Sequence, residues 1–464
     1  MTNVSSLTTE VETFEVLVPR CGNSQILLTE ESGHFLLPRV MVPKYQRVAQ
    51  SITERVAELW KLETVCLFHP GHPSDSQRKY CVVLEPRNTT WQPGENLNWV
   101  ARDALRRALP QDEADAIEEV LKECDSRDNG ILPGPFARRG WLDELMSWAQ
   151  AQLNSLGLTL TGQYQQLNAS PFFSLIRLET DGSAVWFKAV GEPNTRELPI
   201  SVALARLFPA YVPRIIAAEP SWNGWLAVAA EGSRLDEYAE IAPWSNAAVT
   251  LANLQISSFD KVGDLLEAGC KDLRIPALLD QVEPFVESMA ELMERQSKIP
   301  PAALRPEALL ELSKQLKESL SLLEEFSFPN TLGHSDFNPG NVLVSQHGCI
   351  FLDWAEAHVG HPFLTFEYLL EHLRRDHSGD IPRESAIRSS YAEKWSSIYP
   401  AQNVSEGMVM TPLIAVFAYA VAGQGWRNRE RLRDSRFAGY FRALTRRMHR
   451  EANLLRERRE RCLR

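Results

Sequence analysis

The sequence has little cysteine, and its few cysteines form no recognisable pattern. Seven occur in 464 residues, an odd number, and no Cys-x-x-Cys pair or zinc-site spacing joins them. A small secreted scaffold would need dense, paired cysteines, so this class of protein is excluded. The thiols are expected to be scattered and reduced, as in a cytoplasmic protein. Internal repeats and low-complexity tracts are also absent from the sequence.

The chain also lacks an excess of positive charge and a long apolar segment. Its net charge is −11 at pH 7, whereas a general nucleic-acid binder needs a basic face for phosphate contacts. No apolar run approaches the length that spans a bilayer, and the polar start Met1–Ser6 is not typical of a signal peptide. We therefore expect no nucleic-acid partner, no membrane partner and a cytoplasmic location.

What is present indicates more than one folded unit. The hydrophobic fraction of 44% and the charged fraction of 23% are typical of a soluble globular protein, and 464 residues exceed one ordinary domain. Strand-like runs on both sides of an amphipathic helical pattern at 46–60 predict a small α/β domain over residues 1–128. Glycine and proline break regular structure near residue 132, so 129–140 is predicted to be a linker.

One stretch, residues 333–354, carries the strongest chemical pattern. Two apolar runs around a polar turn at 345–348 predict a β-hairpin. This hairpin would bring Asp336, Asn341 and Asp353 to a common end. Their oxygen donors suit magnesium ions that bridge phosphates. The five-residue step from the first aspartate to the asparagine also matches the catalytic loop of kinases.

The same stretch resembles the aminoglycoside phosphotransferase-like branch of the kinase superfamily. That family has His-Gly-Asp, an asparagine five residues after the aspartate, and then Asp-Trp or Asp-Phe. This chain has His334, Ser335 and Asp336, then Asn341, then Asp353 followed by tryptophan. The serine is a small-for-small change from the usual glycine. The resemblance implies that the first aspartate orients an acceptor hydroxyl, that the asparagine and second aspartate hold metal, and that the histidine supports the loop.

A lysine, Lys188, stands in the otherwise apolar strand pattern of residues 184–190. A lysine buried in such a run needs an anionic partner, and Glu197, which opens the helical pattern 197–208, is the natural candidate. The resemblance implies that Lys188 contacts nucleotide phosphates and that Glu197 braces it. The alternatives are a lysine that reaches solvent from a strand edge and a glutamate that only suits a helix N-terminus.

Two further residues are weaker candidates for nucleotide contact. Ser170 lies in the loop 168–173, where kinases place a phosphate-covering turn, although the pattern Gly-x-Gly-x-x-Gly is missing there. Ala230 lies in the segment 230–232, where the resembled family links its two lobes and receives the adenine.

The residues after the tryptophan depart from the family pattern in other ways. His358 and His361, three residues apart, suggest a metal site, but no third ligand accompanies them, so an ordinary loop role is favoured. The following helix, 363–373, lacks the aspartate that many family members carry after the proline. We therefore expect the loop to be anchored differently in this chain.

The N-terminal order of strands and helix is weakly similar to a Nudix-type domain, whose helix carries metal-binding glutamates. The segment Glu54–Leu62 occupies the position of that helix, but only Glu58 matches a metal-ligand carboxylate. Leu59 and Lys61 stand where glutamate and glycine belong. One carboxylate is too few for the cations that such hydrolysis needs. The domain would then be a recognition or assembly module, and an unrelated α/β domain is an equal alternative.

The sequence therefore predicts an α+β protein with a bilobal kinase-like phosphotransferase fold over residues 141–464, preceded by the small α/β domain. The small lobe is expected at about 141–232 and the large lobe at about 233–464. The implied reaction transfers the γ-phosphoryl group of ATP or GTP, with Mg²⁺, to a hydroxyl group of a small molecule. The alternative is a pseudokinase-type module that binds nucleotide and regulates a partner, because the glycine-rich loop is absent. The acceptor and the oligomeric state are not readable from the sequence.

Overall fold

The computed structural model describes residues 10–20, 24–44, 47–67, 81–125, 136–170, 173–298, 300–377 and 379–462. The chain forms two compact units. Unit 1 comprises Met1–Leu198 and Arg214–Ala229, and unit 2 comprises Pro199–Pro213 and Ala230–Arg464. The division falls within helix α5, Glu197–Leu207.

Unit 1 is built mainly from strands. A mixed sheet has the order β4-β1-β6-β5, in which β1 and β6 run parallel, and antiparallel sheets have the orders β3-β2-β7 and β11-β12-β10-β9-β8. Along the chain, the elements that precede the sheet β11-β12-β10-β9-β8 are β1 Val11–Leu17, β2 Gln25–Glu31, β3 His34–Leu36, β4 Arg39–Pro43, α1 Val48–Trp60, β5 Thr64–Cys66, β6 Cys81–Pro86, β7 Leu97–Ala101, α2 Leu105–Ala108, α3 Gln111–Asp125 and α4 Trp141–Leu153.

Helix α1 forms where the sequence predicts it, because its apolar residues recur at helical spacing. Ile52 and Val56 are buried in the core beside the mixed sheet. Glu54 and Glu58 lie on the exposed face, and Glu58 pairs with Arg55 at 2.9 Å. Throughout the part of the chain that the structure describes, no three His, Cys, Asp or Glu side chains gather as a metal site would require.

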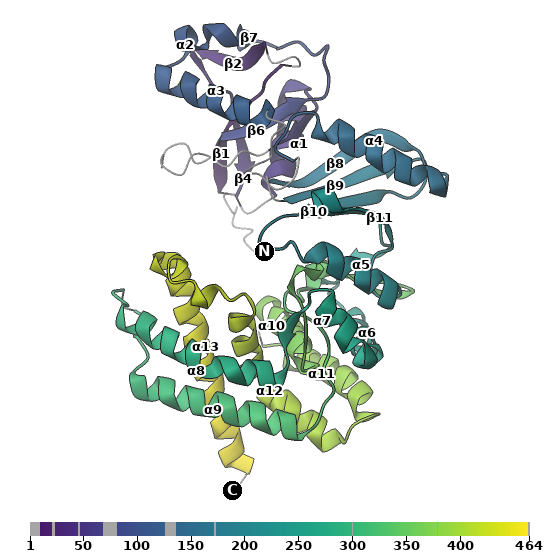
Figure 1. The fold of residues 1–464 in the computed structure, drawn as a ribbon, viewed down its shortest axis with the longest axis vertical. Helices are drawn as coiled ribbons and strands as arrows, with labels where there is room; N and C mark the ends of the chain where they lie inside the picture. Colours follow the sequence, from purple (N-terminus) through teal and green to yellow (C-terminus); the bar gives the residue numbers. More distant parts are fainter. Residues whose placement is uncertain are drawn as a thin grey trace, which may run out of the picture. The chain divides into compact units, whose positions relative to one another are not determined.

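The antiparallel sheet that ends unit 1 contains the strands predicted for the small lobe. These are β9 Phe173–Thr180, β10 Val185–Val190, β11 Ile215–Glu219 and β12 Gly224–Val228. Helix α4 lies across this sheet (Figure 1), and the ring of Trp148 is 6.0 Å from that of Phe187 on β10. In β9 alternate residues are buried, which is the period-2 pattern of a strand with one covered face.

Strand β8, Leu160–Ser170, is a correction to the sequence analysis, which places a loop at its C-terminal end and no strand before it. Its residues are mostly polar, so its alternation is hard to read from the sequence. Gln166 explains how such a strand is held. Its buried amide accepts a hydrogen bond from the N–H of Cys66 (2.7 Å) and donates one to the same residue's carbonyl (2.9 Å). The side-chain amide of Gln166 thus makes the two hydrogen bonds to the edge strand β5 that a neighbouring strand would make.

The core of unit 1 joins residues on both sides of the predicted linker. One buried cluster contains Ile26 and Leu121 from before it, and Leu145 and Phe187 from after it. Residues 126–135, which include the first part of that linker, lie outside the described residues. The contacts therefore group the N-terminal strands with the small-lobe sheet, and the division into modules at 128 and 141 stays a proposal.

Unit 2 is mainly helical. Small sheets have the orders β13-β16-β17 and β14-β18-β15, and β14 runs parallel to β18. Its elements are β13 Ser233–Arg234, α6 Ile241–Ser257, α7 Val262–Glu267, β14 Lys271–Leu273, α8 Ile275–Glu294, α9 Pro306–Glu325, β15 Thr331–His334, β16 Val342–Ser345, β17 Gly348–Phe351, β18 Ala357–Gly360, α10 Phe363–Asp376, α11 Ile381–Ser396, α12 Ala401–Ala422 and α13 Ser435–Cys462.

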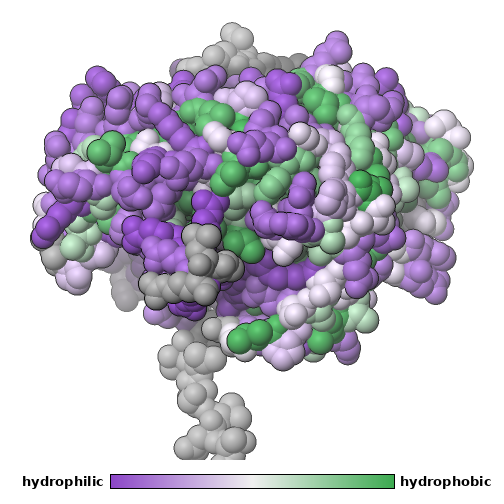
Figure 2. All heavy atoms as spheres, turned by 90° about the horizontal axis from the view of Figure 1, so that it is seen from below, coloured by the Kyte–Doolittle hydropathy of each residue, from purple (hydrophilic) through white to green (hydrophobic). Residues whose placement is uncertain are grey.

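Helix α12 corrects the expectation that no apolar segment approaches the length of a membrane span. Among the described helices, it is long and apolar enough to cross a bilayer. However, 72% of its most apolar stretch is buried inside the protein, as expected for a central core helix. On the face seen in Figure 2, hydrophilic residues predominate and hydrophobic residues form separate patches rather than a continuous band.

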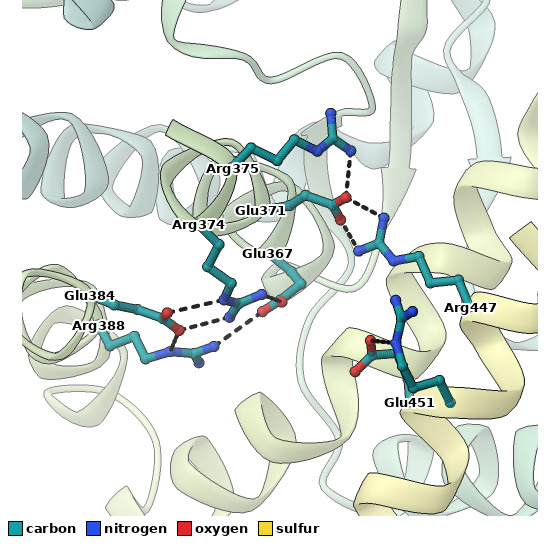
Figure 3. A network of polar contacts seen from close by, with 9 residues as sticks. Glu367, Glu371, Arg374, Arg375, Glu384, Arg388, Arg447 and Glu451 are labelled. Atoms are coloured by element: carbon teal, nitrogen blue, oxygen red, sulfur yellow. Dashed lines mark hydrogen bonds and ion pairs between the residues drawn. The ribbon is translucent and has the colours of Figure 1, made fainter. Parts of the chain in front are cut away.

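The arginine-rich end of the chain forms the long helix α13, which packs on α12. Arg447 pairs with Glu371 of α10 (Figure 3). Further along, Arg461 pairs with Glu457 at 3.6 Å. Part of the positive charge is therefore compensated by neighbouring glutamates, as the sequence suggests for a solvated terminal helix.

Helix α10 is tied to α11 by a network of charged side chains (Figure 3). The carboxylate of Glu367, whose side chain is only 4% exposed, pairs with Arg374 at 2.7 Å and with Arg388 at 3.5 Å. Both arginines also pair with Glu384 of α11, at 2.7 and 2.8 Å. Because each carboxylate meets two guanidinium groups, the buried charge is compensated.

This network predicts an acid-dependent loss of stability. Burial would raise the pKa of Glu384, but hydrogen bonds from Arg374 and Arg388 outweigh it and lower the pKa to about 2, from an ordinary value of 4.5. The stabilisation is therefore present above about pH 4.5 and is lost as the pH falls toward 2. We expect Glu384→Gln to reduce stability by roughly 2–3 kcal/mol at pH 7, with a gap to wild type that narrows as the pH falls from about 4.5 toward 2.

Thermal unfolding over this pH range provides the measurement. Glu393→Gln is the matched control, because Glu393 lies on the exposed face of the same helix. A melting-temperature difference between wild type and Glu384→Gln that stays constant with pH would contradict the assignment.

Candidate active site

The predicted hairpin is present as β16 and β17, with Val342 opposite Phe351 and Ser345 opposite Gly348. One further hydrogen bond extends the pair toward the site: the N–H of Leu352 donates to the carbonyl of Asn341 at 2.8 Å. Asn341 thus lies beside the residue that immediately precedes Asp353. The expectation that the hairpin brings these two chain segments to one end is confirmed.

Asp336 lies in the loop between β15 and β16, and two amides hold its carboxylate. Asn338 donates to one carboxylate oxygen at 3.1 Å, and Asn341 donates to the other at 3.3 Å and to the backbone carbonyl of Asp336 at 3.0 Å. The sequence analysis did not single out Asn338. Its position before proline and glycine, where asparagine readily bonds to nearby backbone and side chains, is the signal that could have identified it.

His334 is fully buried and uses both ring nitrogens. Nε2 lies 2.9 Å from the carbonyl of Leu352, and Nδ1 accepts the backbone N–H of Asp336 at 3.2 Å. Because a carbonyl can only accept, the proton is on Nε2, and the ring is neutral. Burial lowers the pKa of His334, which favours the same form. The ring therefore connects the Asp336 loop to the residue before Asp353, as expected of a supporting residue.

Asp353 adopts a left-handed backbone conformation, with φ 61° and ψ 65°. This conformation costs a residue other than glycine about 1–2 kcal/mol. The turn after it is fixed by Trp354, which is buried and donates its indole N–H to the carbonyl of Phe351 at 3.1 Å. Strain of this kind persists where the surroundings enforce it, and it concentrates at functional sites.

The donors at this end of the hairpin suit Mg²⁺. The amide nitrogen of Asn341 is directed at Asp336, so its oxygen is turned away from that carboxylate. Asp353 supplies a carboxylate from the other side of the hairpin. Hard oxygen donors of this kind are the ligands that Mg²⁺ prefers, so Asn341 and Asp353 are the residues that would hold the ion.

Thr365 anchors the loop from helix α10 and was not predicted. Its hydroxyl oxygen accepts the backbone N–H of His334 at 2.8 Å, and its side chain is fully buried. The sequence analysis expected different anchoring here because the family aspartate is missing. A threonine one turn into the helix carries no signal by itself.

Lys188 and Glu197 form an ion pair in unit 1, with Nζ 2.5 Å from Oε1. Their side chains are 14% and 2% exposed, so Lys188 does not reach freely into solvent. Its ammonium also lies near the rings of Phe173 and Trp225, at 5.8 and 5.7 Å from the ring centres. The pairing predicted from the sequence is therefore confirmed, and the roles of the two residues toward a nucleotide stay a proposal.

The two weaker candidates lie at the ends of strands or just beyond them. Ser170 is the last residue of β8, where it faces Phe173 across the hairpin; residues 171–172 of the predicted loop lie outside the described residues. Ala230 follows β12 and is half-buried. Neither position argues for or against contact with a nucleotide.

The two histidines after the hairpin are core residues. Nδ1 of His358 lies 3.0 Å from the hydroxyl of Ser335, and Nδ1 of His361 accepts the N–H of Phe363 at 3.4 Å. Burial lowers the pKa of each to about 3. Both rings are therefore held inside the protein core, and His358 lies in strand β18 rather than in a loop as predicted.

This combination of loop, hairpin and buried histidine is that of a kinase-like phosphotransferase. Residues 194–398 match the model of the phosphotransferase enzyme family. The matched region, which is less than half of the chain, includes the whole site in unit 2. A search of curated proteins finds no match to the chain.

Several solved structures are similar to this chain. They include macrolide 2′-phosphotransferase MphH from Brachybacterium faecium (17% identity, 65% of this chain and 97% of that chain covered, TM-score 0.42). A putative aminoglycoside phosphotransferase from Ralstonia eutropha shares 15% identity, with 67% and 98% covered and a TM-score of 0.47. Plasmodium vivax ethanolamine kinase shares 14%, with 64% and 83% covered and a TM-score of 0.43. Likeness of this size identifies neither the activity nor the substrate of this chain.

The anchor at Thr365 yields a prediction. Thr365→Val leaves the buried N–H of His334 without its acceptor, which should cost about 1–3 kcal/mol of stability and disturb the loop that carries Asp336. Thr365→Ser keeps the hydroxyl and should resemble wild type. Melting temperatures of both variants provide the measurement. If the two variants are equally destabilised, the hydroxyl is not the anchor.

Proposed function

We propose that this protein is a small-molecule kinase that transfers the γ-phosphoryl group of ATP or GTP to a hydroxyl group. The observation that carries the proposal is the arrangement of Asp336, Asn341 and Asp353 around one end of the hairpin, braced by neutral His334. The family match over residues 194–398 supports the same class of reaction. A cytoplasmic location, with no nucleic-acid or membrane partner, belongs to the same proposal.

Asp336 orients the acceptor hydroxyl and accepts its proton. The two amides at its carboxylate, from Asn338 and Asn341, restrict the rotation of the side chain. Positioning of this kind supplies most of what a phosphoryl transfer needs from the protein, because the transition state is loose and little covalent chemistry is required of side chains.

The remaining residues act on the nucleotide. Mg²⁺, held by Asn341 and Asp353, would neutralise charge on the phosphates. Lys188 contacts phosphate, and Glu197 keeps its ammonium in place through the 2.5 Å pair. Ser170 and Ala230 are proposed to contact phosphate and adenine, respectively.

A nucleotide-binding module without turnover is the second candidate. The absence of Gly-x-Gly-x-x-Gly near residue 170 favours it, because that loop covers the phosphates in kinases. A screen of hydroxyl-bearing metabolites and antibiotics with Mg²⁺ and ATP or GTP separates the two. Phosphorylated product that disappears in Asp336→Asn supports the kinase, whereas nucleotide binding with no product from any acceptor supports the module.

The N-terminal strands are proposed to be a recognition or assembly module rather than a hydrolase. Glu58, the one carboxylate that matches the Nudix pattern, is exposed and paired with Arg55. Lys61, at a position where glycine belongs, caps the end of α1 in a left-handed conformation.

Asp336 and Asp353 are proposed to have different roles, so we expect substitutions at these two residues to cause different defects. Asp353→Ala should remove Mg²⁺-dependent nucleotide binding, because a ligand of the ion is lost. Asp336→Asn should keep this binding and lose turnover by at least about 100-fold, as expected for loss of a catalytic base. Calorimetric titration with nucleotide, with and without Mg²⁺, together with a product assay provides the measurement. Normal affinity in Asp353→Ala would refute the metal assignment.

The ion pair between Lys188 and Glu197 predicts that substitutions at the two residues reduce phosphoryl transfer by different amounts. Lys188→Ala should reduce phosphoryl transfer by about 10- to 100-fold, because a direct phosphate contact is lost, and Glu197→Gln should reduce it less. Steady-state kinetics with varied nucleotide provide the measurement. Lys314→Ala, on the exposed face of α9, is the control. If Glu197→Gln matches wild type, the carboxylate does not brace the lysine.

A further inference from the structure

Ser335 stands directly before Asp336, where the resembled family has glycine. It is only 4% exposed, and its polar groups bind the neighbouring strand region. Its backbone N–H donates to the carbonyl of Glu356 at 3.0 Å, and its hydroxyl oxygen is 3.0 Å from Nδ1 of His358. The contact between the hydroxyl and His358 is one that a glycine could not make.

The position of His358 is matched to the strand opposite. In the pairing of β15 with β18, His358 faces Gly333. A Cβ atom on that glycine would lie 2.1 Å from Nε2 of His358, so the imidazole ring occupies the space that a side chain would need. Gly333 therefore leaves space for the His358 ring, and Ser335 contacts one of the ring nitrogens.

The proton of His358 can be assigned from the surroundings of its two nitrogens. The ring is fully buried, and Nε2 has no hydrogen-bond partner among the described residues. A buried N–H without an acceptor is rarer in proteins than an acceptor without a donor, so Nε2 is the unprotonated nitrogen. Nδ1–H then donates to the hydroxyl oxygen of Ser335. The hydrogen bond between Ser335 and His358 therefore connects the Asp336 loop to strand β18.

We propose that Ser335 is a positioning residue for phosphoryl transfer: held by His358, it fixes the backbone from which Asp336 reaches the acceptor. This inference rests on the proposed function. The residues on both sides of the 335–336 peptide are fixed, because the N–H of Asp336 is held by His334. A displacement of about 1 Å in a catalytic group can cost 100-fold in rate, so a hydroxyl that fixes this peptide affects turnover without touching substrate.

The first test compares kinetics. Ser335→Ala should lower kcat by about 10-fold and change the KM for nucleotide by less than about 2-fold, because Asp336 is displaced while the nucleotide ligands stay in place.

Two variants separate positioning from general loss of stability. Ser319→Ala removes another buried serine hydroxyl, 1% exposed, on helix α9, and it should leave kcat unchanged. Ser335→Gly carries the residue usual in the resembled family, so it is expected to fold, and it should show the same kcat defect as Ser335→Ala. A wild-type kcat in Ser335→Ala and Ser335→Gly would overturn the proposal.

A spectroscopic test does not depend on finding the acceptor. The chain has ten histidines, and nitrogen-15 NMR of histidine-labelled protein should show His358 protonated on Nδ1. In Ser335→Ala the ring-nitrogen signals of His334 should also shift, because Nδ1 of His334 accepts the N–H of Asp336. If wild type phosphorylates no acceptor, the proposed function fails, but the NMR signals still test whether Ser335 fixes the backbone at Asp336. Unchanged His334 signals in Ser335→Ala would overturn that role of Ser335.

Discussion

A neutral histidine ring, buried between two segments of chain, is the interaction on which the candidate site depends. His334 accepts the N–H of Asp336 on one nitrogen and donates to the carbonyl of Leu352 with the other. Protonating the ring would place two donors against each other at Asp336 and would charge a group without access to water. The ring therefore keeps one protonation state. Its width sets the distance between the segment that carries Asp336 and the segment that precedes Asp353.

The loop around this ring is supported by side chains rather than by regular structure. Thr365 holds the N–H of His334, Asn338 and Asn341 hold Asp336, and Ser335 reaches strand β18. Each of these bonds joins groups that would be costly to bury alone. Helix α10, which provides Thr365, is fixed on another side by the Glu367 network. The position of the loop that carries Asp336 thus depends in part on the ion pairs of Glu367, which lie outside the candidate site.

The sequence predicts the parts of this site that have local signals. The hairpin follows from apolar runs around a polar turn, and the pair of Lys188 with Glu197 follows from a lysine in an apolar strand. Thr365, Asn338 and the hydrogen bond between Ser335 and His358 were missed, because their importance comes from contacts between segments that no local pattern specifies. Strand β8 was missed for a related reason: its polar residues are stabilised by Cys66, which lies 100 positions away from Gln166.

That long separation has a consequence for how the protein is made. The backbone groups of Cys66 at the edge strand β5 stay open until Gln166 has been synthesised and has left the ribosome. At roughly 5–20 residues per second, 100 further residues take about 5–20 s. During this interval the N-terminal sheet has an unpaired edge, which is the kind of surface that other chains can bind.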